Sequence, residues 1–135
     1  GQASIQTLPE RKYIPLGEEA TLYQNEIFYF YPTIAFVQDA PSGRPRISFG
    51  AYLEPSQSVP VRYLKQVETL PAMQMLCAHF RGTYPDAIDF GCQLRLAHPE
   101  LPLSDDALHF NIVDQFIETA QENYITEIQI PILDA

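Results

Sequence analysis

Apolar residues in the first third of the chain form one short run and one long stripe. Arg11–Leu16 predicts a β-strand that Gly17 ends. Over Leu22–Val37, apolar residues recur at steps of four and three, the pattern of an amphipathic helix. The residues of this stripe are Tyr23, Ile27, Phe30, Ile34 and Val37. Pro32 would kink the helix because it removes a backbone donor. A strand over Ile27–Tyr31 is the alternative, because aromatic residues favour strands.

Turn-forming residues divide the remainder of the first half. The segment Asp39–Pro45 contains two prolines and one glycine and predicts a loop. Two strands are expected after it, Ile47–Glu54 and Val59–Gln66, joined by the turn residues Pro55 and Ser56. The predicted order of elements in this half is strand, helix, strand, strand.

The second half predicts the same order. Ala72–Phe80 predicts a strand, and a helix follows that runs to about Ala97. Thr83 is suited to cap this helix, and Asp86 three residues later suits both the capping box and the positive end of the helix dipole. Pro85 is tolerated in a first helical turn.

Two further strands close the chain after a predicted loop at His98–Asp106. They span Ala107–Val113 and Tyr124–Leu133. The polar segment between them, Asp114–Asn123, predicts either a loop or a short exposed helix.

A short internal repeat links the two halves. Ile5–Pro9 (IQTLP) recurs as Val67–Pro71 (VETLP), 62 residues later, and the same order of elements follows each copy. We expect an α+β fold of two pseudo-symmetric β-α-β-β repeats, about 3–66 and 67–133, within one domain of residues 1–135. They would form one curved antiparallel sheet with two helices on one face. The groove where the halves meet, flanked by the helices, is the expected ligand site.

Composition favours a globular protein, since 46% of the 135 residues are hydrophobic and 19% are charged. No apolar run approaches the roughly 18 to 20 residues of a membrane span, and the first residues lack a signal-peptide pattern. We therefore expect a cytoplasmic protein with no membrane partner. The formal net charge of −9 would repel nucleic acid and attract cations, so no nucleic-acid partner is expected for this chain alone. Its oligomeric state is open between a monomer and a homodimer.

Residues that bind metals or cofactors lack the spacing of known motifs. Cys77 and Cys92 lie far apart in apolar segments and predict free structural thiols. His79, His98 and His109 show no metal-ligand spacing, and the chain has no glycine-rich phosphate loop or nucleophile elbow. We predict no metal, no cofactor and no assigned catalytic residue.

Three segments resemble the effector-binding domains of MerR-type and AraC-type regulators and the related gyrase-inhibitor-like proteins. Leu8–Arg11 (LPER) resembles the first-strand motif of that family. His79–Tyr84 (HFRGTY) resembles its junction from strand into helix, and Tyr124–Ile132 (YITEIQIPI) closely resembles its closing strand. With the repeat, the resemblance spans nearly the whole chain.

This resemblance implies a multidrug-binding pocket for lipophilic, often cationic, molecules, lined by aromatic residues and carrying one buried carboxylate. Such chemistry is sound, because a delocalised cation stacks on aromatic faces and needs one counter-charge once it is dehydrated. The family places its carboxylate in the penultimate strand, where this chain has Leu108 or His109 instead. The sequence departs from the family pattern at that position.

Polar and apolar residues alternate along Ala107–Val113, which places His109 and Asn111 on one face of the strand. If helices cover the apolar face, both polar side chains meet solvent. Otherwise they are polar anchors of the pocket, with a neutral imidazole able to donate or accept a hydrogen bond.

Aromatic and acidic residues supply the other candidates for ligand binding. Those that could line the pocket, and that suit plain core packing equally, are Tyr23, Ile27, Phe30, Phe49, Tyr52 and Tyr124. The candidate counter-charges are Glu26 and Glu127, either of which also suits an exposed surface.

We therefore predict a non-enzymatic binding module for hydrophobic, cationic compounds, acting as a sensor or a sequestering protein. The first alternative is a small hydrolase of the gyrase-inhibitor-like group that uses a Glu and Tyr pair. Tyr124 and Glu127 are poor candidates for that pair, because residues three apart on a strand point to opposite faces. The second alternative is an acidic protein-interaction module, which only the net charge supports.

Overall fold

Strand pairing dominates the architecture of the chain. The structure, a computed structural model, describes residues 2–18, 32–55, 58–113 and 119–133. Its strands are β1 (Ser4–Leu8), β2 (Arg11–Gly17), β3 (Thr33–Gln38), β4 (Arg46–Leu53), β5 (Glu68–Leu70), β6 (Met73–Arg81), β7 (Ala107–Val113) and β8 (Ile125–Pro131). The α-helix α2 spans Tyr84–Ala97, and short 3-10 helices lie at η2 (Ala40–Ser42), η3 (Val61–Gln66) and η4 (Gln121–Asn123).

In the described part of the chain, the eight strands form one antiparallel sheet in the order β1-β6-β8-β7-β3-β4-β2-β5. The order is pseudo-symmetric. Exchanging β1 with β5, β2 with β6, β3 with β7 and β4 with β8 reverses it, so the centre of the pseudo-symmetry lies at the β3–β7 pair. The two halves also pair at β1–β6 and β2–β5. The expected fold class, an α+β protein with one curved antiparallel sheet, is confirmed.

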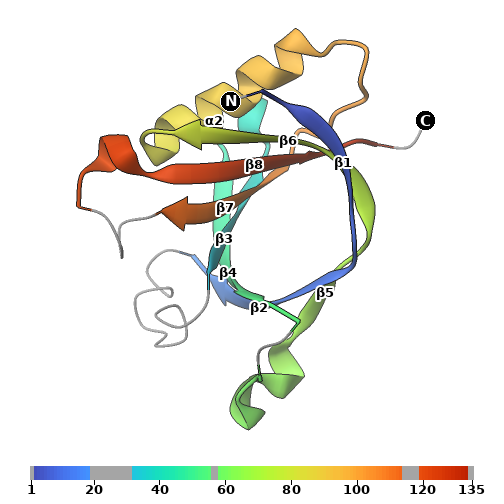
Figure 1. Cartoon of the computed structure of the whole chain (residues 1–135), viewed down its shortest axis with the longest axis vertical. Coiled ribbons are helices and arrows are strands. Elements are labelled where there is room, and N and C mark those ends of the chain that lie inside the picture. Colours follow the sequence, from blue (N-terminus) through green and yellow to red (C-terminus); the bar gives the residue numbers. More distant parts are fainter. Residues whose placement is uncertain (1, 19–31, 56–57, 114–118, 134–135) are drawn as a thin grey trace.

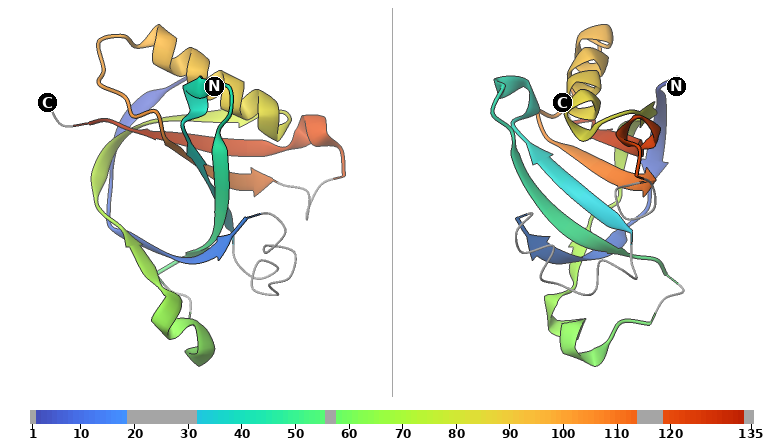
Figure 2. Two further views of the ribbon diagram at one scale, coloured as in Figure 1. Left: turned by 180° about the vertical axis from the view of Figure 1, so that it is seen from behind. Right: turned by 90° about the vertical axis from the view of Figure 1, so that its left-hand side faces the viewer.

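The sheet curls until its ends approach each other, and α2 lies outside the curl along β6 and β8 (Figures 1 and 2). One face of the sheet is therefore concave and the other convex. Helix α2 packs on the convex face, where Ala87 and Leu94 of the helix contact Ala78, Ile128 and Ile130 of the strands. Within the described residues, no helix is both long and apolar enough to cross a membrane.

Helix α2 begins where the sequence predicts. The Thr83 side chain accepts a hydrogen bond from the backbone N–H of Asp86 at 3.3 Å, and Asp86 lies in the first turn at the positive end of the helix. The helix ends at Ala97, as expected. Capping signals are local in sequence, which is why they locate this helix accurately.

The expected helix over Leu22–Val37 is wrong for its last residues, which form β3. Residues 19–31, with the alternative strand at Ile27–Tyr31, lie outside the described residues. Strand β3 pairs with β4 on one side and β7 on the other, and Thr33, Ile34, Ala35 and Val37 are buried. A strand buried on both faces carries a continuous apolar run, and such a run also fits a helical stripe.

The expected strand over Val59–Gln66 is also wrong, because Val61–Gln66 form the 3-10 helix η3 with no buried residue. The short strand β5 follows at Glu68–Leu70 and pairs with the start of β2. The last two strands of the first half are therefore β3 and β4. In the second half, η4 fits the short exposed helix expected within Asp114–Asn123, of which residues 114–118 lie outside the described residues.

Candidate functional site

The concave face of the sheet carries four aromatic side chains from four strands. Tyr13 of β2 packs on Phe36 of β3 with ring centroids 4.9 Å apart, and Tyr52 of β4 meets the edge of Phe110 of β7 at 5.4 Å. Gly50 makes room for the first pair, because a Cβ there would lie 3.0 Å from Tyr13 and 3.1 Å from Phe36. Buried Ile34, Met75, Cys77 and Leu108 form the floor of this aromatic face.

Arg11, the first residue of β2, crosses the concave face from one half of the chain to the other. Its Nη1 donates to Oε1 of Gln129 on β8 at 2.8 Å, and its Nη2 lies 3.8 Å from the sulfur of Met75 on β6. The guanidinium carbon lies over the ring of Phe110, 5.2 Å from its centre. Its Nε is buried and has no hydrogen-bond partner among the described residues.

Glu127 supplies a carboxylate beside this cation. Its two oxygens are held from two sides, since Gln129 Nε2 donates to Oε2 and His79 Nε2 lies 3.2 Å from Oε1. The Glu127 side chain is 24% exposed and that of His79 is 59% exposed, so solvent reaches this carboxylate and the imidazole beside it. One continuous line of polar side chains therefore crosses the aromatic surface, formed by Arg11, Gln129, Glu127 and His79.

Burial changes the proton affinity of two groups on this face. Desolvation lowers the pKa of the Arg11 guanidinium, while Tyr52, Cys77 and Glu127 oppose that shift. Burial, with the charge of Glu127, raises the pKa of the Cys77 thiol to about 11. Cys77 is therefore a protonated thiol at neutral pH and a poor nucleophile. Among the described residues, no three His, Cys, Asp or Glu side chains gather as metal ligands.

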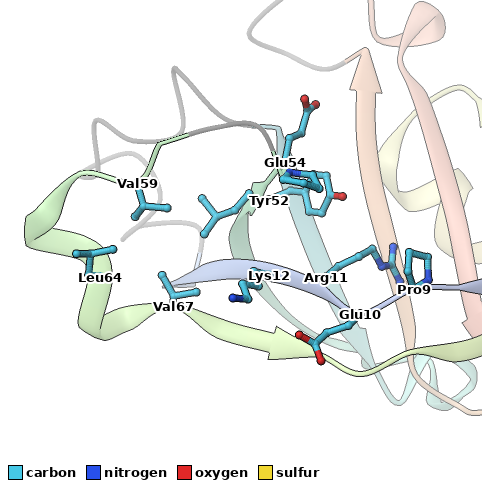
Figure 3. A pocket seen from close by; sticks show the side chains of 11 residues that line it. Pro9, Glu10, Arg11, Lys12, Tyr52, Glu54, Val59, Leu64 and Val67 are labelled. Atoms are coloured by element: carbon cyan, nitrogen blue, oxygen red, sulfur yellow. The ribbon is translucent and has the colours of Figure 1, made fainter.

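A cavity of about 600 Å³ opens at the end of the sheet that carries η3, and Leu53, Val59 and Val67 in its wall belong to the core on the opposite face (Figure 3). Arg11 and Tyr52 line the cavity and also contact the aromatic face. The other lining residues are Pro9, Glu10, Lys12, Leu53, Glu54, Pro55, Val59, Leu64 and Val67. A volume of this size is typical of sites for drug-sized molecules.

Solved structures match this fold along almost the whole chain. No protein-family profile matches the chain, and no curated protein matches it in sequence. The C-terminal domain of EcmrR superposes with a TM-score of 0.63 at 13% identity, over 99% of this chain and 98% of that domain. In the complex of EcmrR with DNA, the match covers 58% of the EcmrR chain.

Two further matches carry other names. SAV2435 bound to tetraphenylphosphonium has a TM-score of 0.63 at 15% identity, over 98% of this chain and 94% of that protein. A hydrolase from Listeria innocua has a TM-score of 0.64 at 10% identity, over 98% of this chain and 92% of that protein.

The chain has the fold of the EcmrR C-terminal domain and of SAV2435. The resemblance to the effector-binding domains of MerR-type regulators and to gyrase-inhibitor-like proteins is thereby confirmed at the level of the fold. Identities of 10% to 15% establish the architecture alone, so ligand and mechanism have to be argued from the side chains of this chain.

Two of the residues predicted from the sequence lie together on the concave face, Tyr52 and Glu127. Phe49 lies on the opposite face, packed against Ala51 and Leu53. Tyr124 stacks on Tyr84 at the start of α2, with ring centroids 5.1 Å apart. Tyr23, Glu26, Ile27 and Phe30 lie outside the described residues.

His109 and Asn111 share a face, as the alternation predicts, but that face is covered by α2. His109 pairs with Ile128, which contacts the helix, and only 5% of His109 is exposed. Burial, with the nearby charge of Arg95, lowers the pKa of His109 to about 4. The apolar residues Leu108 and Phe110 are the ones that point to the concave face. His109 therefore does not face solvent, and it lies on the opposite side of the sheet from the aromatic site.

Reasoning from the sequence missed Arg11, Tyr13, Phe36, Phe110 and Gln129. The alternation of polar and apolar residues in Ala107–Val113 did indicate that Phe110 and His109 lie on opposite faces of the strand. The only sequence feature that distinguishes Arg11 is that a charged residue ends the LPER motif and begins the strand that follows. Its contact with Gln129, 118 residues away, has no local signal.

Proposed function

We propose that this chain is a binding module for hydrophobic organic molecules and that it favours cations. The position of Arg11 is the observation that carries the proposal. Its planar, positively charged guanidinium lies over the ring of Phe110 on the concave face, and the carboxylate of Glu127 is close by. An aromatic face with an adjacent counter-charge is what a lipophilic cation needs once water is removed.

Four observations support a small molecule as the occupant. The aromatic face comes from four strands of a curved sheet, so it is concave rather than flat. Its polar groups are few and converge at Glu127, which suits orientation of a mainly apolar ligand. The net charge of −9 raises the local concentration of cations. SAV2435, which shares the fold, was solved with tetraphenylphosphonium.

We propose further that residues 1–135 act as one domain, with repeats at about 3–66 and 67–133, and that it serves as a sensor or a sequestering protein in the cytoplasm. A binding role is better supported than a hydrolase. Tyr124 packs beside α2, whereas Glu127 lies on the concave face, so this pair does not converge on one substrate. Tyr13 does meet a carboxylate, Glu68, at 3.0 Å. Burial and that hydrogen bond raise the pKa of Tyr13 to about 12, which makes it a poor proton donor in catalysis.

Titration with tetraphenylphosphonium tests the proposal. At a free concentration 100 times its Kd, the ligand should stabilise the fold by about 2.7 kcal/mol, seen as a rise in Tm. Phe110→Leu keeps apolar volume but removes the aromatic face, so it should weaken binding about tenfold. Phe49→Leu makes the same change on the opposite face of the sheet and should leave binding unchanged. Absence of binding, or equal loss in the two variants, would contradict the proposal.

A further inference from the structure

Arg11 occupies the position in the concave face that a cationic ligand would use. Phe110 and Glu127 are direct cross-strand neighbours on that face, and the guanidinium lies over the ring of Phe110. Glu127 favours the charged form of Arg11, and Tyr52 contacts the same ring of Phe110. The aromatic ring and the carboxylate therefore act on this side chain as they would act on a bound organic cation.

The partners of Arg11 are weak for a guanidinium removed from water. A guanidinium has five N–H donors. Here one bonds to the neutral oxygen of Gln129, one points at the thioether of Met75, and Nε is buried without a partner among the described residues. Glu127 lies outside ion-pair distance of it, being held by Gln129 and His79. Removing the guanidinium of Arg11 from water costs desolvation energy, and its hydrogen bonds on the concave face offset only part of that cost.

Arg11 also borders a cavity that its side chain could enter on displacement. It is the first residue of β2 and lines the cavity of about 600 Å³, whose wall includes the carboxylate of Glu10. In the view of Figure 3, the side chain of Arg11 runs away from Val59 and Leu64. Because Arg11 lines this cavity, we expect a bound ligand to displace its guanidinium into the cavity, whose charged lining also includes Lys12 and Glu54.

We infer that Arg11 is a built-in competitor, a specificity-determining residue that fills the cation position of the empty site and is displaced by a bound cation. This inference rests on the proposed function. It has a quantitative consequence, because a site that is open for a fraction of the time binds with its intrinsic affinity reduced by that fraction. If Arg11 occupies the site about nine-tenths of the time, its removal strengthens cation binding about tenfold.

Binding of tetraphenylphosphonium and of tetraphenylborate, two ions of the same shape and opposite charge, distinguishes a competitor role of Arg11 from other roles. We expect Arg11→Met to bind tetraphenylphosphonium about tenfold more tightly than the wild type, with no gain for tetraphenylborate. Arg46→Met is the matched control, since Arg46 also begins a strand but is 73% exposed and paired with Asp39. It removes the same charge and should leave the affinity of both ions unchanged. Arg11→Gln replaces Arg11→Met if the latter does not fold.

The other outcomes are distinct. Equal tetraphenylphosphonium affinity in the wild type and Arg11→Met would overturn the competitor role while leaving the proposed function intact. Tight binding of tetraphenylborate by the wild type, lost in Arg11→Met, would make Arg11 an anchor for anions and would also overturn it. If neither ion binds any variant, the proposed function itself is wrong.

A second measurement needs no variant. The guanidinium carbon of Arg11 lies over the ring of Phe110, so the NMR signals of the Arg11 guanidinium N–H groups in the free protein should carry a ring-current shift. Saturating tetraphenylphosphonium should move these signals to the positions of an exposed arginine. Signals that stay shifted in the complex would contradict displacement.

Discussion

Phe110 and Glu127 are paired across β7 and β8 and point to the same, concave face of the sheet. The pairing places an aromatic ring and a carboxylate directly opposite each other on two neighbouring strands. It also explains why His109, one residue away from Phe110, lies under α2 instead. Successive side chains of a strand alternate between its faces, so only one of these neighbours can reach the ligand.

Replacing Glu127 by Gln should weaken tetraphenylphosphonium binding about fivefold, equivalent to about 1 kcal/mol for a partly exposed charge pair. The loss should shrink when salt is added, because screening reduces the contribution of the carboxylate in the wild type. Titrations at low and high salt measure it. Glu122→Gln, an exposed carboxylate in η4, is the control. Equal effects of the two substitutions would show that only the net charge matters.

His109 predicts a pH dependence of stability rather than of binding. Its pKa is lowered to about 4 by burial, whereas a histidine in the unfolded chain titrates near 6.5. The unfolded state therefore binds more protons between these values, and stability is lost as the pH falls from about 6.5 toward 4. The full loss is on the order of 3 kcal/mol.

Urea unfolding of the wild type and of His109→Gln at pH 7 and pH 4.5 measures this contribution. The difference in unfolding free energy between the two proteins should change by about 2 kcal/mol between these pH values, to the disadvantage of the wild type. Parallel pH profiles would show that His109 is not buried in its neutral form.

Replacement of glycine by alanine should have opposite effects on stability at Gly50 and at Gly91. Gly50→Ala should destabilise the fold by about 1 to 3 kcal/mol, because the new Cβ would press on Tyr13 and Phe36 at 3.0 and 3.1 Å. Gly91→Ala should stabilise it by up to about 1 kcal/mol, since alanine favours the helix and its Cβ would meet Arg95 and Ile128 at ordinary distances of 3.7 and 3.8 Å. Urea unfolding checks both signs, and a stable Gly50→Ala would contradict the tight packing of the aromatic pair.

The parts of the fold that could be predicted from the sequence are those with local signals. Thr83 and Asp86 located the start of α2, and alternation in Ala107–Val113 separated its two faces. The β3 strand was mistaken for helix because it is covered on both faces and lacks alternation. Whether Val59–Gln66 pairs with a neighbour depends on the rest of the sheet, and β2 is occupied instead by β5.

The candidate site was harder to predict because its residues meet only through the curvature of the sheet. Arg11 reaches Gln129 and Met75 because the ends of the sheet approach each other. The sequence also leaves open which face of β7 a helix covers, so it does not show whether His109 or Phe110 lies on the face that binds a ligand. Strand periodicity assigns residues to faces but does not identify the face that encloses the ligand.

A crystal structure of the chain with tetraphenylphosphonium tests the central claim most directly. The account predicts the phosphonium within about 6 Å of the centre of the Phe110 ring, the distance of a cation–π contact, with Glu127 beside it and Arg11 displaced from the ring. A ligand bound on the convex face near His109, or a ligand on the concave face that leaves the guanidinium of Arg11 over Phe110, would contradict it.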